Sequence, residues 1–241
     1  MKKAIFSITI LTISLLFISF ITVKKTPRIL VYAKTRGYHH AAIAAGLVAI
    51  QKLGAENNFS VDTTTDSTYF TPKTLQKYAA IVFLSTTGNV LNDAQQLAFE
   101  KYIQAGNGFV GVHAATDTEY DWPWYNQLVG AYFKSHPKQQ EAVLNIVDGN
   151  HISTKHLPKT WKRFDEWYNF KSIQPNLHVL ITIDEKSYTG GENGDTHPMA
   201  WYHDFDGGRA FYTEFGHTDE SYQDPMFLQH LLGGIQYAMN K

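Results

Sequence analysis

The stretch Gly108-Phe109-Val110-Gly111-Val112-His113-Ala114-Ala115-Thr116-Asp117 decides the fold class of this chain. Its apolar beginning predicts a short buried strand, and the small residues that follow predict a tight turn into a helical segment. Such an arrangement lifts one side chain above the edge of a sheet, and here that side chain is His113. Asp117 follows closely enough to orient or charge-balance the imidazole. The alternative is a histidine whose hydrogen bonds are satisfied at the end of a strand.

The segments on both sides of this stretch continue the alternation of strand and helix. Strands are predicted at 28–33, 59–64 and 79–84, and helices at 41–53, 72–78 and 93–105. Farther along, the pattern predicts strands at 139–147, 161–170, 178–183, 199–203 and 209–215, then a helix at 225–239. Alternation in the first half is typical of right-handed crossovers and a parallel sheet. No repeat or linker interrupts residues 27–241, so we predict one α/β domain there.

The first 26 residues have the composition of an export signal. Lys2 and Lys3 precede an uncharged, apolar run at 4–23, which Lys24 and Lys25 close. A run of about 20 such residues is long enough to cross a bilayer, and no small-x-small cleavage pattern ends it. We therefore expect residues 1–26 to be a signal peptide or signal anchor. The protein is expected to be exported, periplasmic or anchored to the membrane by residues 4–23.

The composition excludes several classes of function. Net charge is −1 and no basic stripe is present, so nucleic acid is not an expected partner. The chain has no cysteine, which excludes disulfides, thiolate metal sites and a cysteine nucleophile. Eleven histidines and an aromatic content of 14% fit a site for polar, ring-shaped ligands.

Polar residues follow several of the predicted strands. In a parallel sheet, functional loops lie beyond the carboxyl ends of the strands. His40 follows the first strand, Thr86 the third, and His217 follows the strand at 209–215. His39 and His40 are adjacent and cannot share one face, so we expect only His40 in the site. His113 and His217 are the first two candidates for catalytic residues.

Asp165 and Glu166 are adjacent acids within one predicted strand. Neighbours in a strand point to opposite faces, so one of these carboxylates points inward and needs a partner. One reading makes Asp165 or Glu166 a general acid or base. The other is a structural salt bridge with Arg163 or Arg209.

Further candidates for substrate binding are aromatic or histidine residues in loops. Asp121 could bind sugar hydroxyls beside an aromatic platform of Trp122 and Trp124; the alternative is a rigid loop packed on the core. His136 and His197 each precede a proline and are expected in extended backbone, where either could line the site. Trp201 is a further candidate for a stacking surface in substrate binding.

A series of segments resembles the trehalose-utilisation ThuA-like family over nearly all of the chain after the leader. In order they are 36–40 (RGYHH), 111–118 (GVHAATDT), 121–125 (DWPWY), 128–133 (LVGAYF), 136–137 (HP), 164–168 (FDEWY), 197–201 (HPMAW), 208–212 (GRAFY) and 216–218 (GHT). The resemblance implies a flavodoxin-like three-layer sandwich with a mostly parallel central sheet, similar to class I glutamine amidotransferases. In those enzymes a cysteine occupies the elbow. His113 aligns with it here, so glutamine hydrolysis is not implied.

The resemblance also suggests a class of substrate. Members of the family are linked to uptake and breakdown of trehalose and related disaccharides, and accompany dehydrogenases that make 3-keto sugars. A carbonyl at C3 acidifies the neighbouring C–H bond, so a base can initiate elimination or isomerisation. The expected function is an extracytoplasmic enzyme acting on a disaccharide, glycoside or keto-sugar. The alternatives are a non-catalytic carbohydrate-binding or regulatory module, and a structural envelope protein.

A metal cofactor is left open by the sequence. Histidines with one carboxylate would suit zinc or a similar divalent ion. No pair of histidines shows a helical ligand spacing such as HExxH, so any such site must be assembled from distant loops.

Overall fold

The computed structural model describes residues 26–240 of the chain. The expected leader and its apolar run at 4–23 lie outside the described residues, apart from residue 26. Within 26–240, no helix combines the length and apolar character that crossing a bilayer requires.

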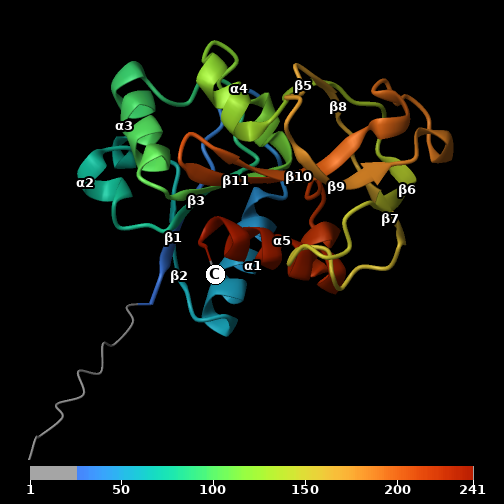
Figure 1. Ribbon diagram of the computed structural model, residues 1–241, viewed down its shortest axis with the longest axis horizontal. Coiled ribbons are helices and arrows are strands. Elements are labelled where there is room, and N and C mark those ends of the chain that lie inside the picture. Colours follow the sequence, from blue (N-terminus) through green and yellow to red (C-terminus); the bar gives the residue numbers. More distant parts are fainter. Residues whose placement is uncertain (1–25, 241) are drawn as a thin grey trace, which may run out of the picture.

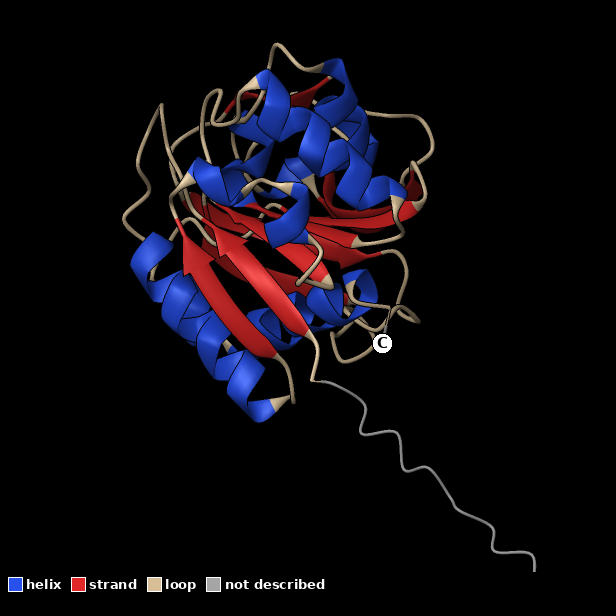
Figure 2. Cartoon of the chain, turned by 90° about the vertical axis from the view of Figure 1, so that its left-hand side faces the viewer, coloured by secondary structure: helices blue, strands red, loops and turns tan. Residues whose placement is uncertain are grey.

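A nine-stranded sheet lies between two layers of helices (Figure 2). Five strands form its parallel part in the order β2-β1-β3-β4-β11. Their bounds are β1 (Arg28–Tyr32), β2 (Ser60–Thr64), β3 (Ala80–Leu84), β4 (Gly108–Val112) and β11 (Gly208–Thr213). This is the strand order of flavodoxin-like folds, with β11 as the fifth strand.

The second half of the chain extends this sheet with antiparallel pairs. The order continues from β11 through β10 (Pro198–Phe205), β9 (His178–Ile183), β6 (Gln140–Ile146) and β7 (Thr160–Asp165). Only β10 and β6 run against the other strands, because each further antiparallel pairing reverses the direction again. The prediction of a mostly parallel α/β three-layer sandwich is confirmed.

The helices divide between the two faces of the sheet (Figure 1). Helices α1 (Ile43–Glu56) and α5 (Pro225–Ala238) contact each other on one face. Helices α2 (Pro72–Leu75), α3 (Asp93–Gln104) and α4 (Pro123–Val129) cover the opposite face. Helix α3 begins at a capping box in which the Asn92 side chain accepts from the Gln95 backbone N–H. That cap places the helix start where the sequence pattern predicts it.

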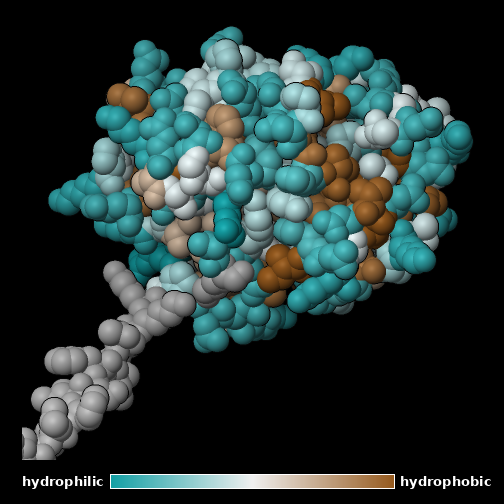
Figure 3. Space-filling model, in the orientation of Figure 1, coloured by the Kyte–Doolittle hydropathy of each residue, from teal (hydrophilic) through white to brown (hydrophobic). Residues whose placement is uncertain are grey.

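The buried core follows from the apolar runs of the parallel strands. Every residue of β3 and β4 is buried. Phe83 and Phe99 stack with ring centroids 5.4 Å apart, and Phe109 packs edge-on against both. Figure 3 shows the outside of one face, where hydrophobic residues form patches among more numerous hydrophilic ones.

One predicted strand is divided in two. The alternating pattern predicts a single strand at 161–170, but β7 ends at Asp165. The chain then crosses to β8 (Asn169–Lys171), which pairs with β5 (Tyr132–Ser135) in a separate two-stranded sheet. The Glu166 N–H donates to the Asp165 carboxylate, and the Tyr168 N–H donates to the Glu214 carboxylate. Side-chain carboxylates therefore take the donors that a continuous strand would use in its ladder.

Candidate functional site

Two hollows differ in the chemistry of their walls. A groove of about 780 Å³ lies between α1 and α5 and is lined largely by apolar side chains, among them Ala45, Val48 and Leu228. Its described lining contains no histidine. A smaller pocket of about 310 Å³, here called the histidine pocket, contains five of the histidines and acids that the sequence places in the site. It is lined by Tyr38, His40, Asp117, Phe133, His136, Gln139, Glu166, Tyr168 and His217.

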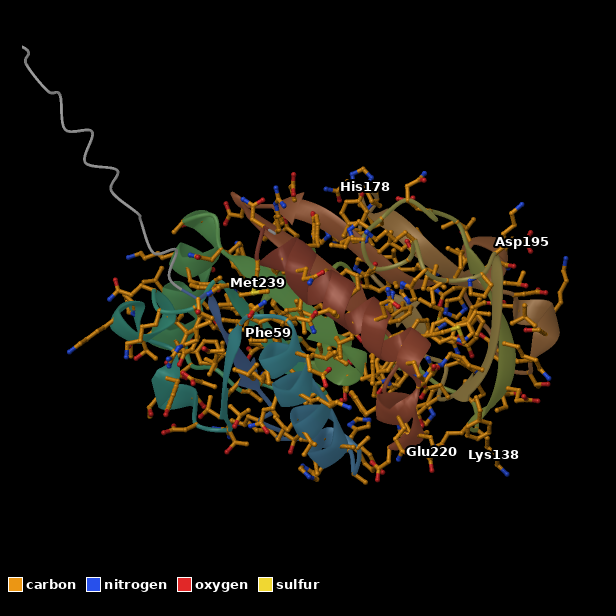
Figure 4. The ribbon with its side chains drawn as sticks, turned by 90° about the horizontal axis from the view of Figure 1, so that it is seen from below. Phe59, Lys138, His178, Asp195, Glu220 and Met239 are labelled. Carbon is orange, nitrogen blue, oxygen red and sulfur yellow. The ribbon has the colours of Figure 1, made fainter. Side chains whose placement is uncertain are left out.

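The histidine pocket lies at the carboxyl edge of the sheet. His40 follows β1, Asp117 follows β4, and His217 follows β11. Figure 4 shows Lys138 and Glu220, which flank two segments of the pocket, together at one edge of the molecule. Met239, at the other end of α5, lies far from them in that view. The pocket therefore occupies the edge where parallel α/β sheets bind their ligands.

His113 lies at the turn that leaves β4. Its φ is +50°, in the left-handed region, and it begins a short 3-10 helix, His113–Asp117. The Tyr212 hydroxyl donates to the His113 carbonyl over 2.7 Å, which holds the turn. The ring is buried, and its Nδ1 lies 2.7 Å from the Glu214 carbonyl oxygen. The sharp strand-to-helix turn expected from the sequence is present.

Two imidazoles and a carboxylate meet beside this turn. His113 Nε2 lies 3.1 Å from His217 Nδ1. Glu166 Oε2 lies 3.0 Å from His217 Nδ1 and 3.5 Å from His113 Nε2. The second carboxylate oxygen, Oε1, lies 3.0 Å from His136 Nδ1. The structure thus brings together both histidines expected to be catalytic.

His40 completes the group. Its ring packs edge-on against His113 and His217, with centroid distances of 4.8 and 5.2 Å. The ligand atoms that His40, His113, Glu166 and His217 offer all lie within 4.8 Å of one another. His39 is exposed and lies outside this group. These four side chains are the ones that could hold a metal ion in the described part of the chain.

Burial and neighbouring groups shift several pKa values here. Burial, together with the adjacent His113 and His217, lowers the pKa of His40 to about 3. For Glu166, burial opposes ionisation, but the adjacent His113 and His217 outweigh it and hold its pKa below the usual range. Burial raises the pKa of Glu214 well above its usual value. Near neutral pH, Glu166 is ionised beside the uncharged ring of His40.

Asp165 was expected to share the acid–base role, and the structure gives it another. Its carboxylate pairs with Arg163 at 2.9 Å, as the structural reading anticipated. The same group accepts from the Ser221 hydroxyl and from the backbone N–H groups of Gly216 and His217. Asp165 therefore holds the loop that carries His217, while Glu166, on the other side of the strand end, faces the pocket.

Asp117 was expected to orient His113, and this expectation is corrected. Both ring nitrogens of His113 are engaged by Glu214 and His217. Asp117 instead accepts from the Tyr120 hydroxyl over 2.7 Å and lines the histidine pocket. Burial raises its pKa. Backbone placement, with the Glu214 carbonyl opposite Nδ1, orients the imidazole.

The proposed stacking tryptophans belong to the core side of the fold. Trp122 and Trp124 stack on each other at 5.0 Å, and their indole N–H groups donate to Glu100 and Asp206. Trp201 is fully buried and donates to the Val129 carbonyl. None of the three lines the histidine pocket within the described chain, so the packing alternative holds for this loop.

Three polar residues expected in the site also lie elsewhere. Thr86 is buried and bonds the Thr118 hydroxyl at 2.8 Å. Asp121 accepts from the Asn89 side chain. His197 is buried, with its ring nitrogens 2.8 Å from the Glu185 carboxylate and 2.8 Å from the Tyr168 carbonyl. His197 therefore supports the backbone behind the pocket, whereas His136 lies in the wall.

Four residues of the pocket wall were not anticipated: Tyr38, Phe133, Gln139 and Tyr168. Tyr38 and Tyr168 each lie two residues from a cluster member, which is a weak signal available in the sequence. Phe133 and Gln139 carry no such signal, because their position depends on how β5 and β6 pack beside the parallel sheet.

Comparisons with known proteins agree with this architecture. A family model, ThuA, described as trehalose utilisation, matches residues 28–238. A solved ThuA-like protein from Bacteroides uniformis is 25% identical, with a TM-score of 0.75 over 89% of this chain and 93% of its own. One from Parabacteroides merdae is 22% identical, with a TM-score of 0.75 over 89% and 90%.

More distant likeness shows the fold alone. A cytoplasmic protein from Salmonella typhimurium is 10% identical, with a TM-score of 0.62 over 87% of this chain and 98% of its own. A comparison with curated proteins finds no match. Because the family model spans nearly all of the described residues, the chain belongs to the ThuA family, whose description implies a role in trehalose utilisation.

Proposed function

We propose that this protein is an enzyme of sugar utilisation acting on a disaccharide, glycoside or keto-sugar, with chemistry centred on His113, His217 and Glu166. One observation carries the proposal: these side chains, from three separate strand ends, converge within 3.5 Å of one another beside the histidine pocket. A structural protein has no need for such a group, and a pure binder could use aromatic and amide side chains. The family's link to trehalose supports the substrate class.

The convergent group is suited to moving protons. A carboxylate beside imidazoles provides groups that can accept a proton from a C–H bond next to a sugar carbonyl, or from a hydroxyl group or water. A positioned acid or base of this kind typically contributes about 10²–10⁴-fold to the rate. Elimination, isomerisation and hydrolysis of a keto-glycoside all begin with such a transfer.

The pocket wall supports a ring-shaped, hydroxylated ligand. A volume of about 310 Å³ is near the lower end of the roughly 300–1,000 Å³ of ligand pockets, which favours one sugar ring at the cluster. Phe133 and Tyr168 pack with centroids 4.3 Å apart and offer an aromatic surface in place of the tryptophans. Asp117 and Gln139 offer hydrogen bonds to hydroxyl groups.

Export or membrane anchoring by residues 4–23 is part of the proposal and rests on the sequence alone. Fractionation of cells that express the full-length chain with a C-terminal tag tests it. Recovery from the cytosolic fraction alone would contradict it.

The activity is tested with the full-length chain and a panel of trehalose, other disaccharides and their 3-keto derivatives, followed by NMR. Turnover of at least one sugar is expected. His113→Asn is expected to lose it by about 10²-fold or more while sugar binding persists. His203→Asn is a matched control, since His203 is also buried but bonds the Gln127 carbonyl away from the pocket.

Each other outcome has a defined meaning. If sugars bind without turnover and His113→Asn changes only affinity, the protein is a carbohydrate-binding module. If no sugar is turned over or shifts the melting temperature, the sugar proposal fails altogether.

A further inference from the structure

We propose that His40, His113, Glu166 and His217 bind one divalent transition-metal ion at the floor of the histidine pocket, with zinc the best match. Its place in a sugar reaction rests on the proposed function, but the ion site itself rests on the geometry of these side chains.

The spacing of three donor atoms is close to that of a tetrahedral zinc site. Zinc bonds of about 2.0–2.2 Å to nitrogen and oxygen place neighbouring ligand atoms about 3.3–3.6 Å apart. His113 Nε2, His217 Nδ1 and Glu166 Oε2 are separated by 3.1, 3.0 and 3.5 Å. Small movements of the side chains would open this triangle to the required size. Imidazole nitrogens with one carboxylate are a ligand set that zinc favours.

The tautomer of His113 already suits a metal ligand. A carbonyl oxygen only accepts, so the 2.7 Å contact with Glu214 places the proton of a neutral ring on Nδ1. The lone pair is then on Nε2, the atom that faces His217 and Glu166. Histidine ligands usually donate their other ring N–H to a carbonyl or carboxylate in this way.

The other two proposed ligands, His217 and Glu166, also contact side chains that would orient them toward the ion. His217 Nε2 lies 2.7 Å from the side-chain amide of Gln139. With the amide turned so that its oxygen faces the ring, Nε2–H donates and the Nδ1 lone pair points to the cluster. Glu166 Oε1 lies 3.0 Å from His136 Nδ1, which orients the carboxylate and leaves Oε2 for the ion.

His40 gives an independent indication that a cation binds here. Its side chain is 3% exposed, and its Nδ1 has no hydrogen-bond partner among the described residues. Buried polar atoms without a partner are costly and uncommon in folded proteins. A cation bound among the three imidazoles and the carboxylate would give buried lone pairs, such as that of His40, a favourable partner.

The site would face the substrate. His40, Glu166 and His217 all line the histidine pocket, so a bound sugar can reach the ion. An ion held there would polarise a carbonyl or hydroxyl oxygen of the sugar. With Glu166 taken up as a ligand, Asp117, which lines the same pocket outside the ligand set, would accept the proton in its place.

The test uses the full-length chain stripped of metal with a chelator and checked for folding by circular dichroism. Titration with Zn²⁺ by calorimetry is expected to show one ion per chain. On titration with Co²⁺, the bound ion is expected to show visible absorption bands typical of cobalt coordinated by nitrogen and oxygen atoms. Glu166→Gln and His217→Asn should abolish binding, and Gln139→Ala should weaken it about 10–100-fold.

His39→Asn is the matched control for His40→Asn, because His39 is its exposed neighbour. His40→Asn should weaken binding and His39→Asn should leave it unchanged. The inference is overturned if the folded, stripped wild-type chain binds neither ion, or if both variants behave alike. Undiminished sugar turnover by the metal-free chain would overturn the role of the ion in the reaction and leave the proposed function intact. Metal binding without turnover of any sugar would instead leave the ion site and remove the proposed function.

Discussion

At the scale of single residues, the backbone of His113 is the least ordinary feature of the site. A left-handed conformation costs a residue other than glycine about 1–2 kcal/mol. Here φ is +50°, and the surrounding strand, the Tyr212 hydroxyl and the Glu214 carbonyl hold it. Such local strain persists where the rest of the structure over-determines it, and it is typical of functional sites.

Asp165 provides a prediction at the same scale. Asp165→Asn removes the nearer counter-charge of the buried Arg163 guanidinium and leaves it with Asp224 at 3.7 Å, so we expect a loss of about 3 kcal/mol in the free energy of unfolding. Urea denaturation measures it. Glu141→Gln is the control, because the Glu141–Lys162 pair has the same 2.9 Å length but is exposed. It should cost less than about 1 kcal/mol.

A different result would restore the catalytic reading of Asp165. That reading requires Asp165→Asn to lose sugar turnover with unchanged unfolding free energy. The positioning role requires the two losses to appear together, since the same carboxylate holds the Gly216 and His217 backbone.

At the scale of elements, the end of β7 determines which acid enters the site. Asp165 and Glu166 point to opposite sides there, as alternation in a strand requires. The strand ends because Asp165 and Glu214 accept backbone N–H groups that would otherwise extend the ladder. Glu166 is thereby placed beside His217 rather than within a continuous sheet.

The end of α4 gives a second prediction. Gly130 closes this helix with a φ of +96°, and a Cβ added there would collide with the Trp201 indole nitrogen. Gly130→Ala is expected to lower the unfolding free energy by about 2 kcal/mol or more, from backbone strain and overpacking. Gly149→Ala, where an added Cβ meets nothing within 4 Å, should change it by less than about 0.5 kcal/mol.

Chemical denaturation of both variants checks this prediction. Equal stability of Gly130→Ala and Gly149→Ala would mean that Trp201 is free to move. Its exclusion from the ligand site would then need another explanation.

At the scale of the whole molecule, buried histidines make stability depend on pH. Burial lowers the pKa of His230 from 6.5 to about 3, so this ring stays neutral in the fold. The unfolded chain binds the proton first, and the contribution of His230 to stability therefore falls as pH drops from about 6.5 towards 3. The slope approaches about 1.4 kcal/mol per pH unit.

His230→Gln removes this titration and isolates its effect. The stability advantage of the wild type over the variant is expected to shrink steadily below pH 6.5, in urea denaturation at several pH values. The His230 ring lies between the Ser153 carbonyl and the Thr213 hydroxyl, away from the histidine pocket. A difference that stays constant from pH 7 to pH 4 would contradict the lowered pKa.

What the sequence determined by itself is local. Apolar runs and caps predict β1, β3, β4 and α3 to within about a residue, because periodicity and capping depend on neighbouring residues. The turn at His113 and the strand-end positions of His40 and His217 follow from the same patterns. The parallel alternation then implies that these strand ends share one edge.

What only the tertiary structure decided is which side chains face one another. Trp122, Trp124 and Trp201 have the composition of a sugar platform, but Trp122 and Trp201 are buried, Trp124 is half-buried, and all three donate to partners distant in the chain. The choice of Glu166 over Asp165 likewise depends on Arg163 and the loop that carries His217. Alternation along a strand determines on which face of the strand a side chain lies. Which residues contact that face depends on long-range packing.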